Sequence, residues 1–310
     1  RLYSVSNATV ISEIQSNMKF FRFSKQLLVI IIIGISFSAT DFYSDSWALL
    51  IGINEYQYET PLHYAVADAK EMKRLLSEKL DFPDENITIL LDSAATLQGI
   101  RRSIEDLENK TSENDRVLIY FGGHGKTKLL PGGGEMGYLI PVNGKSSNLL
   151  STSLPMSEMK QISRILPAKD ILFLMDACYS GLMGIESMGL DLNDNPPLEQ
   201  LAAGGSRTVI TAGQKDEIAQ ARAEWGHSAM VKSLLYGLDK GMADKMPRDG
   251  YITETELFTH LQYQVYVDTD QAQKPSISHF TTEQGQFVFI IDKVNVQIEN
   301  DAEDEFSELK

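Results

Sequence analysis

The chain has 310 residues, with 28 Lys and Arg against 43 Asp and Glu, which gives a formal net charge of −15. Hydrophobic residues make up 43% and charged residues 23%, which excludes an intrinsically disordered chain. The acidic balance argues against nucleic-acid binding, because that function needs a basic surface to neutralise phosphates. The single cysteine, Cys178, excludes an internal disulfide framework and a cysteine-based zinc site, and leaves inert packing or a reactive nucleophile.

The N-terminal segment is typical of a targeting signal. A basic stretch at residues 18–25 precedes an apolar run at 27–37, and small residues follow it. This is the order of a secretory signal peptide, and the run is shorter than the ~20 residues that span a bilayer. We therefore expect a cleaved signal peptide within residues 1–39 and an exported protein, periplasmic or extracellular. The chain opens with Arg1, so two readings stay open: translation starts at Met18, or the chain is a fragment anchored by an uncleaved apolar run.

Strands and helices alternate between residues 45 and 292, which we expect to form one domain. Short continuous apolar runs predict buried strands at 47–53, 86–91, 116–121, 170–175, 207–212 and 286–291, the last closing the sheet. Apolar residues at helical spacing predict helices at 64–79, 96–107 (capped by Thr96), 156–165, 228–238 and 253–265. This order predicts an α/β fold with a mostly parallel sheet covered on both faces. Residues 293–310 are rich in acids and predict a solvated tail.

Two stretches between these elements are too long for simple connections, Gly122–Ser153 and Tyr179–Ser206. Both follow strands, and in open α/β sheets the ligand crevice lies at the carboxyl ends of the strands. His124 stands at the start of the first stretch, and Cys178 immediately precedes the second. If the two strands are neighbours, imidazole and thiol face each other across one crevice, as a thiol nucleophile requires.

The residues around this histidine and cysteine resemble those of the caspase-like cysteine peptidases. Asp-Ala-Cys-Tyr-Ser-Gly at 176–181 follows Phe-Gly-Gly-His-Gly at 121–125 at the spacing of about 50 residues typical of that family. The similarity extends to residues 48–54, 67–69 and 249–253, and is strongest to the metacaspase and prokaryotic caspase-homologue branch of peptidase family C14. It implies a caspase-like three-layer α/β sandwich on a sheet of about six mostly parallel strands.

The resemblance also implies an activity, that of a cysteine endopeptidase with a Cys-His dyad. Cys178 would attack the scissile carbonyl, His124 would protonate the leaving amine, and the N–H groups of Gly125 and Cys178 would form the oxyanion hole. Asp68 and Asp176 match the paired aspartates of the metacaspase specificity pocket, which suits Arg or Lys before the cleaved bond. The expected partner is a polypeptide, with no nucleic acid, and with a membrane only if the N-terminal apolar segment is uncleaved.

Two positions depart from the pattern of that branch. Tyr179 stands where a histidine is usual and Gly122 where a serine is usual, and either change can alter the lining of the pocket.

No cofactor and no resident metal are expected. Some metacaspases are activated by calcium, and Asp191, Asp194 and Glu199 offer carboxylates for it, although a solvated acidic loop is the simpler interpretation.

Simpler interpretations stay open for the individual residues. A lone cysteine at a strand end is often a small buried hydrophobe, Asp176 can be a capping residue, and Asp68 can be a solvated helix acid. The other histidines are interpreted as structural or surface residues, and Trp225 as part of the core or of the cleft wall: His63, His227, His260 and His279. For the whole protein, the alternatives are a catalytically silent caspase-fold scaffold or regulatory binding module, and an enzyme that passes the thioester to an amine.

Overall fold

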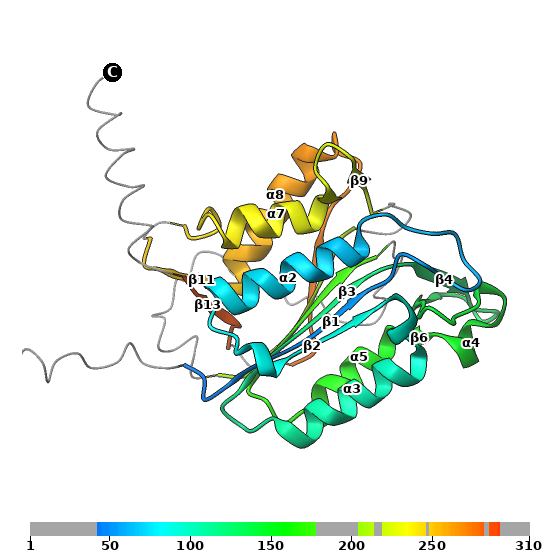
Figure 1. Cartoon of the computed structure of the whole chain (residues 1–310), viewed down its shortest axis with the longest axis horizontal. Helices are drawn as coiled ribbons and strands as arrows, with labels where there is room; N and C mark the ends of the chain where they lie inside the picture. The colour runs from blue at the N-terminus through cyan, green and yellow to red at the C-terminus, as the bar shows by residue number, and fades with distance from the viewer. Residues whose placement is uncertain (1–41, 178–203, 214–218, 246–247, 282–284, 292–310) are drawn as a thin grey trace, which may run out of the picture. The chain divides into compact units, whose positions relative to one another are not determined.

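A six-stranded sheet forms the centre of the computed structural model, which describes residues 42–177, 204–213, 219–245, 248–281 and 285–291 (Figure 1). The strands lie in the order β12-β8-β7-β3-β1-β2. Their bounds are β1 Ser46–Gly52, β2 Ile87–Leu91, β3 Arg116–Gly122, β7 Asp170–Asp176, β8 Ser206–Thr211 and β12 Ser276–His279. Five strands are mutually parallel, and β12 pairs antiparallel to β8 at the edge. The predicted α/β class and mostly parallel sheet are confirmed, and β3 and β7 are neighbours.

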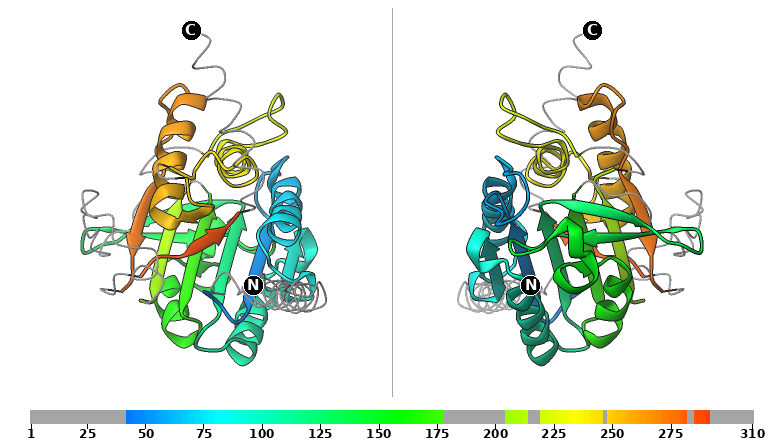
Figure 2. Two further views of the ribbon diagram at one scale, coloured as in Figure 1. Left: turned by 90° about the vertical axis from the view of Figure 1, so that its left-hand side faces the viewer. Right: turned by 90° about the vertical axis from the view of Figure 1, so that its right-hand side faces the viewer.

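Helices cover both faces of this sheet, because its strands bury alternate residues on opposite sides. Leu50 and Leu118 pack on one face against α2 (Ala65–Lys79), α7 (Ala229–Leu238) and α8 (Glu254–Asp268). Leu49 and Ile119 pack on the other face against α3 (Leu97–Lys110) and α5 (Ser157–Ile165). Figure 2 shows yellow α7 and orange α8 on one side of the sheet and α3 and α5 on the other. The result is the three-layer sandwich expected from the sequence.

The helix starts follow capping residues that the sequence supplies. The Thr96 side chain accepts a hydrogen bond from the N–H of Gly99 at 3.0 Å, as predicted. Ser228 caps α7 in the same way, and Thr253 with Glu256 forms a capping box at the start of α8. Each cap satisfies N–H groups that have no partner within the helix, which fixes where the helix begins.

One strand prediction was wrong, and one strand was missed. Residues 286–291 do not close the main sheet: β13 (Val288–Ile290) pairs antiparallel with β11 (Tyr251–Thr253) in a separate ribbon. The sixth strand of the sheet is β12, whose sequence Ser-Ile-Ser-His lacks an apolar run because an edge strand is only half covered.

The stretch from Gly122 to Ser153 is not a long loop. It contains an antiparallel hairpin of β4 (Gly125–Leu129) and β5 (Glu135–Leu139), to which β6 (Leu154–Pro155) adds a third strand. The hairpin turn needs glycine, because Gly133 and Gly134 have φ angles of 87° and 85°. The remaining short elements are η1 (Asp84–Asn86), η2 (Asp92–Ala94), η3 (Ser146–Asn148), α4 (Leu149–Thr152), β9 (Ala221–Arg222) and β10 (His227–Ser228).

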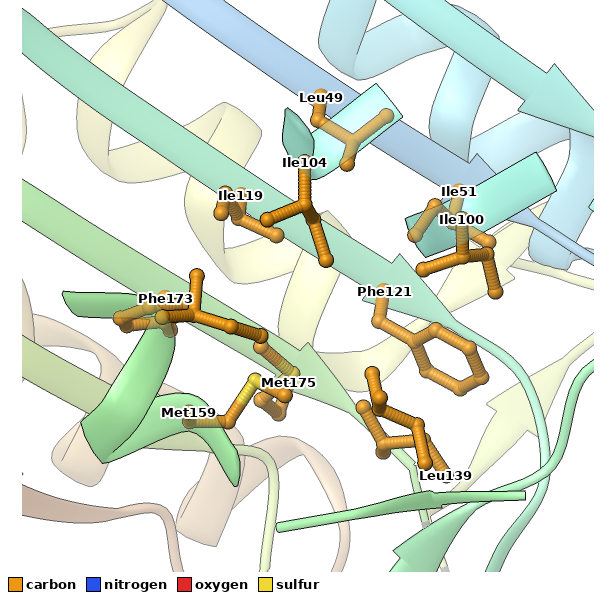
Figure 3. Close-up of a pocket in the computed structure, with 12 residues that line it drawn as sticks. Leu49, Ile51, Ile100, Ile104, Ile119, Phe121, Leu139, Met159, Phe173 and Met175 are labelled. Carbon is orange, nitrogen blue, oxygen red and sulfur yellow. The ribbon is translucent and has the colours of Figure 1, made fainter. Parts of the chain in front are cut away.

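A small cavity lies in the core between the sheet and α3 with α5 (Figure 3). Its volume is about 10 Å³ and its lining is apolar, including Leu49, Phe121 and Met175. That volume holds about one water-sized sphere, and no polar group is there to bind a water. The cavity is therefore a packing void and not a ligand site.

A buried arginine ties the base of the sheet to three other segments. Arg116 at the start of β3 is 1% exposed, and its guanidinium donates to Ser46 Oγ (2.8 Å) and to the carbonyls of Leu80 and Val288 (2.7 Å each). The guanidinium carbon also lies 4.4 Å from the ring centre of Phe82, a cation–π contact. Burial lowers the pKa of Arg116 to about 10, so the group stays charged at neutral pH.

We expect Arg116→Met to lower the free energy of unfolding by about 3 kcal/mol, because it leaves two buried carbonyls without their donors. Chemical denaturation of both forms measures the change. Arg102→Met on the exposed face of α3 is the matched control and should change stability by less than about 0.5 kcal/mol. Equal destabilisation by the two substitutions would contradict this role of Arg116.

Several predicted features lie outside the described residues: the signal peptide within residues 1–39, the acidic tail 293–310, Cys178, Tyr179, and the candidate calcium ligands Asp191, Asp194 and Glu199. Within the part of the chain that the structure describes, no helix has the length and hydrophobicity needed to cross a bilayer.

Candidate active site

The predicted catalytic residues follow two neighbouring strands. The last residues of β3 and β7, Gly122 and Asp176, stand opposite each other, and the N–H of Gly123 donates to the Asp176 carbonyl at 3.2 Å. His124 is the second residue after β3, and Cys178 is the second residue after β7. Cys178 itself lies outside the described residues, so the structure brings the two chain segments together without describing the thiol.

The imidazole of His124 is held from two sides by one loop, residues 54–63 between β1 and α2. His124 Nε2 lies 2.8 Å from the carbonyl oxygen of Thr60. The backbone N–H of His124 donates to the hydroxyl of Tyr56 at 2.7 Å, and the two rings pack with their centres 4.7 Å apart. The ring position is therefore fixed before any substrate binds.

This contact also determines the tautomer of the neutral imidazole. A carbonyl oxygen only accepts hydrogen bonds, so Nε2 of His124 carries the proton that points to Thr60. In the neutral ring Nδ1 is then the unprotonated nitrogen, and it is the one available to take and return a proton.

The loop that holds His124 is anchored by a carboxylate. Asp92 Oδ1 accepts hydrogen bonds from the backbone N–H groups of Asn54 and Glu55, at 2.8 and 2.9 Å. Asn54 Oδ1 in turn accepts from the N–H of Val66 at 3.2 Å in the first turn of α2. The loop is thus tied to α2 and to the chain after β2.

The two glycines before His124 leave room for two tyrosine hydroxyls. A Cβ on Gly123 would lie 2.5 Å from the Tyr56 hydroxyl, and a Cβ on Gly122 would lie 2.6 Å from the Tyr120 hydroxyl. At Gly122, where the resemblance to metacaspases leads one to expect a serine, the Tyr120 hydroxyl lies where a side chain would begin. Gly125 begins β4, opposite Leu139 of β5, directly after His124.

The two predicted pocket aspartates meet at one residue. Asp68 lies in the first turn of α2, and its Oδ2 accepts from the N–H of Ser228 at 3.2 Å. Asp176 Oδ2 accepts from the Ser228 hydroxyl at 2.5 Å and from Tyr120 at 3.3 Å. Both carboxylates are buried, 1% and 6% exposed. The structure therefore brings together two residues that are more than a hundred positions apart in the sequence.

Burial dominates the electrostatics of this pair. Desolvation, followed by the charge of Asp68, raises the pKa of Asp176 to about 7. Desolvation also raises the pKa of Asp68, although hydrogen bonds from His227 and Ser228 act in the opposite direction. Asp176 Oδ1 is buried and has no hydrogen-bond partner among the described residues, which leaves an acceptor for a ligand.

A comparison with protein-family profiles shows to which family this chain belongs. The sequence profile of the caspase domain (Peptidase C14) matches residues 45–284. The chain belongs to the caspase-domain family. This confirms the resemblance seen in the sequence.

The caspase-domain chain is similar to several curated metacaspases. It is 26% identical to Metacaspase-4 of Arabidopsis thaliana over 198 residues, 61% of this chain and 43% of that protein. It is 31% identical to Metacaspase-6 of the same plant over 144 residues, 43% of this chain and 38% of that protein. The chain spans less than half the length of these relatives.

Solved structures share the fold of this caspase domain. A protein of Geobacter sulfurreducens superposes with a TM-score of 0.54 at 16% identity, over 76% of this chain and 93% of that one. Caspase-1 of Spodoptera frugiperda superposes with a TM-score of 0.51 at 13% identity, over 78% and 88%. At these identities the likeness shows the fold alone.

The caspase-domain site contains residues that the sequence interpretation missed. Tyr56, Thr60, Tyr120 and Ser228 were not singled out, and His227, interpreted as structural or surface, bonds Asp68 at 2.7 Å. Only the position of His227 directly before the capped helix α7 gave a signal, since the other contacts depend on tertiary structure.

Of the remaining histidines, His63 lies in the loop that holds His124, whereas His260 and His279 contact other parts of the fold. His260 is buried with Nε2 3.2 Å from the Ser233 carbonyl, and His279 Nδ1 lies 2.9 Å from Thr208 Oγ1. Trp225 sits on the β9–β10 hairpin with the guanidinium carbon of Arg222 4.6 Å from its ring centre. Among the described residues, no three His, Cys, Asp or Glu side chains are grouped to hold a metal ion.

Proposed function

We propose that this protein is a cysteine endopeptidase that hydrolyses peptide bonds with Cys178 as nucleophile and His124 as general acid and base. The observation that carries the proposal is the immobilised imidazole of His124 at the end of β3, beside the strand that leads to Cys178. A scaffold has no need of a histidine oriented in this way. Membership of the caspase-domain family supports the same chemistry.

In the proposed reaction Nδ1 of His124 takes the thiol proton and Cys178 Sγ attacks the scissile carbonyl. The oxyanion is stabilised by backbone N–H groups of Gly125 and Cys178, an interaction worth several kcal/mol of barrier. Imidazolium then protonates the leaving amine, and water hydrolyses the thioester with His124 as base. The Thr60 carbonyl stabilises the imidazolium throughout, because it accepts the proton on Nε2.

The proposed specificity is for Arg or Lys before the cleaved bond. Two buried carboxylates meet at Ser228, and one oxygen of Asp176 is unpartnered among the described residues. A guanidinium or ammonium group would supply both the missing hydrogen bond and the opposite charge. A substrate with aspartate before the cleaved bond would place a third carboxylate beside Asp68 and Asp176, and the repulsion between the negative charges would disfavour its binding.

The proposed chemistry uses only groups of the chain itself and water, so we expect no cofactor requirement. We also propose that calcium can activate the enzyme, and that the N-terminal apolar segment directs its export. Both are tested on the full chain, by assaying with calcium or EDTA and by sequencing the N-terminus of the secreted protein.

Fluorogenic peptides that end in Arg, Lys or Asp test the function directly. We expect hydrolysis after Arg and Lys and at most slow hydrolysis after Asp, and inhibition by thiol alkylation. Absence of hydrolysis of every peptide, with and without calcium, would favour the catalytically silent scaffold. Amine-dependent product formation without hydrolysis would favour the acyl-transferring enzyme.

Tyr56 positions His124, and its removal should affect kcat more than KM. We expect Tyr56→Ala to lower kcat roughly 10- to 100-fold, because the ring that packs on the imidazole and the hydroxyl that binds the His124 N–H are both lost. Tyr56→Phe keeps the ring and should recover most of kcat.

The control for Tyr56 is Tyr58→Ala, because Tyr58 is 54% exposed and contacts Lys145 instead of His124. Steady-state kinetics on the Arg peptide give both constants. A Tyr56→Ala enzyme with unchanged kcat, or one that loses activity only through unfolding in a thermal melt, would refute the positioning role.

A further inference from the structure

The imidazole of His227 bonds directly to one of the two pocket carboxylates. His227 lies in β10, next to Ser228, and its Nδ1 is 2.7 Å from Asp68 Oδ1. With the Ser228 N–H on Oδ2, both oxygens of Asp68 have partners. The two aspartates are therefore not equivalent: Asp176 keeps an oxygen that no described residue bonds, whereas Asp68 contributes chiefly its charge.

Building on the proposed function, we propose that His227 is a specificity-determining residue: its protonation offsets the charge of Asp68, so the pocket binds a cationic substrate side chain most tightly when the imidazole is neutral. With a protonated imidazole, one positive charge faces two carboxylates. With a neutral imidazole, the Nδ1–H still bonds Asp68 but the positive charge is gone.

Four charge pairs lie on the elements around His227: Glu71 with Arg74, Lys232 with Asp268, Arg222 with Asp270, and Asp239 with Lys240. The charge of Glu71 on α2 also acts on the imidazole and raises its pKa, in the same direction as Asp68 but to a smaller extent. Asp68 is the carboxylate in direct contact with the ring, and Asp176 lies behind it through Ser228. The charge state of His227 therefore acts first on the pocket pair.

His227 also has access to bulk solvent. Its side chain is 24% exposed and borders a cavity of about 260 Å³ between α7 and α8, together with Lys232 and Tyr236. Its hydrogen bond with Asp68 raises the pKa of His227 above its ordinary value. Exchange with solvent lets the imidazole follow the pH of the medium, so the pocket gains negative charge as the pH rises through the raised pKa of His227.

The test measures peptide binding in the absence of turnover. A peptide ending in Arg, and the same peptide ending in neutral citrulline, are titrated calorimetrically into Cys178→Ala and into Cys178→Ala with His227→Asn, at pH 6 and pH 9. Asparagine presents an amide N–H near the position of Nδ1–H, so the hydrogen bond to Asp68 is retained without a titratable charge.

We expect the His227→Asn form to bind the Arg peptide about tenfold more tightly than its parent at pH 6 and equally at pH 9, since a unit charge close to the ligand is removed only at the lower pH. Citrulline binding should be the same in both forms. Asp176, whose pKa is raised to about 7, is ionised at pH 9, so the affinities at pH 9 are the reference for the comparison. Lys240→Asn removes a 62% exposed positive charge near the same cavity and should change the affinity by less than about twofold.

Equal affinities of the two forms for the Arg peptide at pH 6 overturn the inference. Arg and citrulline peptides that bind equally at pH 9 overturn the carboxylate pocket, and this inference with it. Hydrolysis by the wild-type chain is measured separately, so failure of the proposed activity is told apart from failure here. If His227→Asn does not fold, the protonation of His227 is followed by NMR in Cys178→Ala as the pH is raised, and the affinities for the Arg and citrulline peptides are measured over the same pH range. The inference is overturned if the ratio of the two affinities does not rise as His227 loses its proton.

Discussion

Cys178→Ala should abolish peptide hydrolysis, with kcat on an Arg peptide falling by at least roughly 10³-fold. The substitution removes only a thiol, so we expect the thermal melting curve to be unchanged. His124→Ala should cost nearly as much, because without the imidazole the thiol keeps its proton and the leaving amine receives none. The double variant should be little worse than either single one, since members of a catalytic unit are not additive.

The matched control for this experiment is His63→Ala. His63 is an exposed residue of the same loop that holds His124. Its ring lies edge-on to the neighbouring Tyr64, with ring centres 6.3 Å apart, and its backbone carbonyl accepts a hydrogen bond from Asn54. Its loss should change kcat less than about twofold. Near-wild-type turnover by Cys178→Ala or by His124→Ala would end the dyad assignment.

Neutralising either pocket aspartate should weaken the preference for basic residues. We expect Asp176→Asn to lower kcat/KM on Arg peptides by roughly 10- to 100-fold, because it removes a charge that faces the substrate cation in a buried place. Asp68→Asn should have a smaller effect, since Asp68 is already bonded by His227.

The ratio of rates on Arg and citrulline peptides separates specificity from general damage. Both substitutions should lower this ratio while leaving the citrulline rate nearly unchanged. Asp106→Asn, on the exposed face of α3, is the control and should leave the ratio as it is. Faster cleavage after Asp than after Arg by the wild-type protein would overturn the pocket assignment.

The pH dependence of the site follows from the same burial. Because desolvation raises the pKa of Asp176 to about 7, its carboxylate regains its charge only as the pH rises through neutrality. Binding of a basic substrate therefore strengthens with rising pH even without His227. The histidine adds a second titration in the same direction, which is why a variant is needed to separate the two.

The sequence by itself determined the class of the fold and the family. The apolar runs of β1, β3 and β7 are continuous because each strand is buried on both faces. Each strand is seven residues long, so the run can be recognised from those seven residues alone. Thr96 and the glycines around His124 are also local signals, since a cap or a close backbone approach constrains one residue type at one position.

Tertiary structure alone decided the edge of the sheet and the surroundings of the site. β12 was missed because a half-covered edge strand needs no apolar run, and β13 was misplaced because its apolar residues pack in a ribbon with β11 instead. Tyr56 and His124 are in contact although they are 68 positions apart in the sequence, and His227 and Asp68 are in contact across 159 positions. No local pattern encodes such a contact, because the side chains meet only after strands and helices have packed, and this packing determines the proton-carrying nitrogen of His124 and the charge of the pocket.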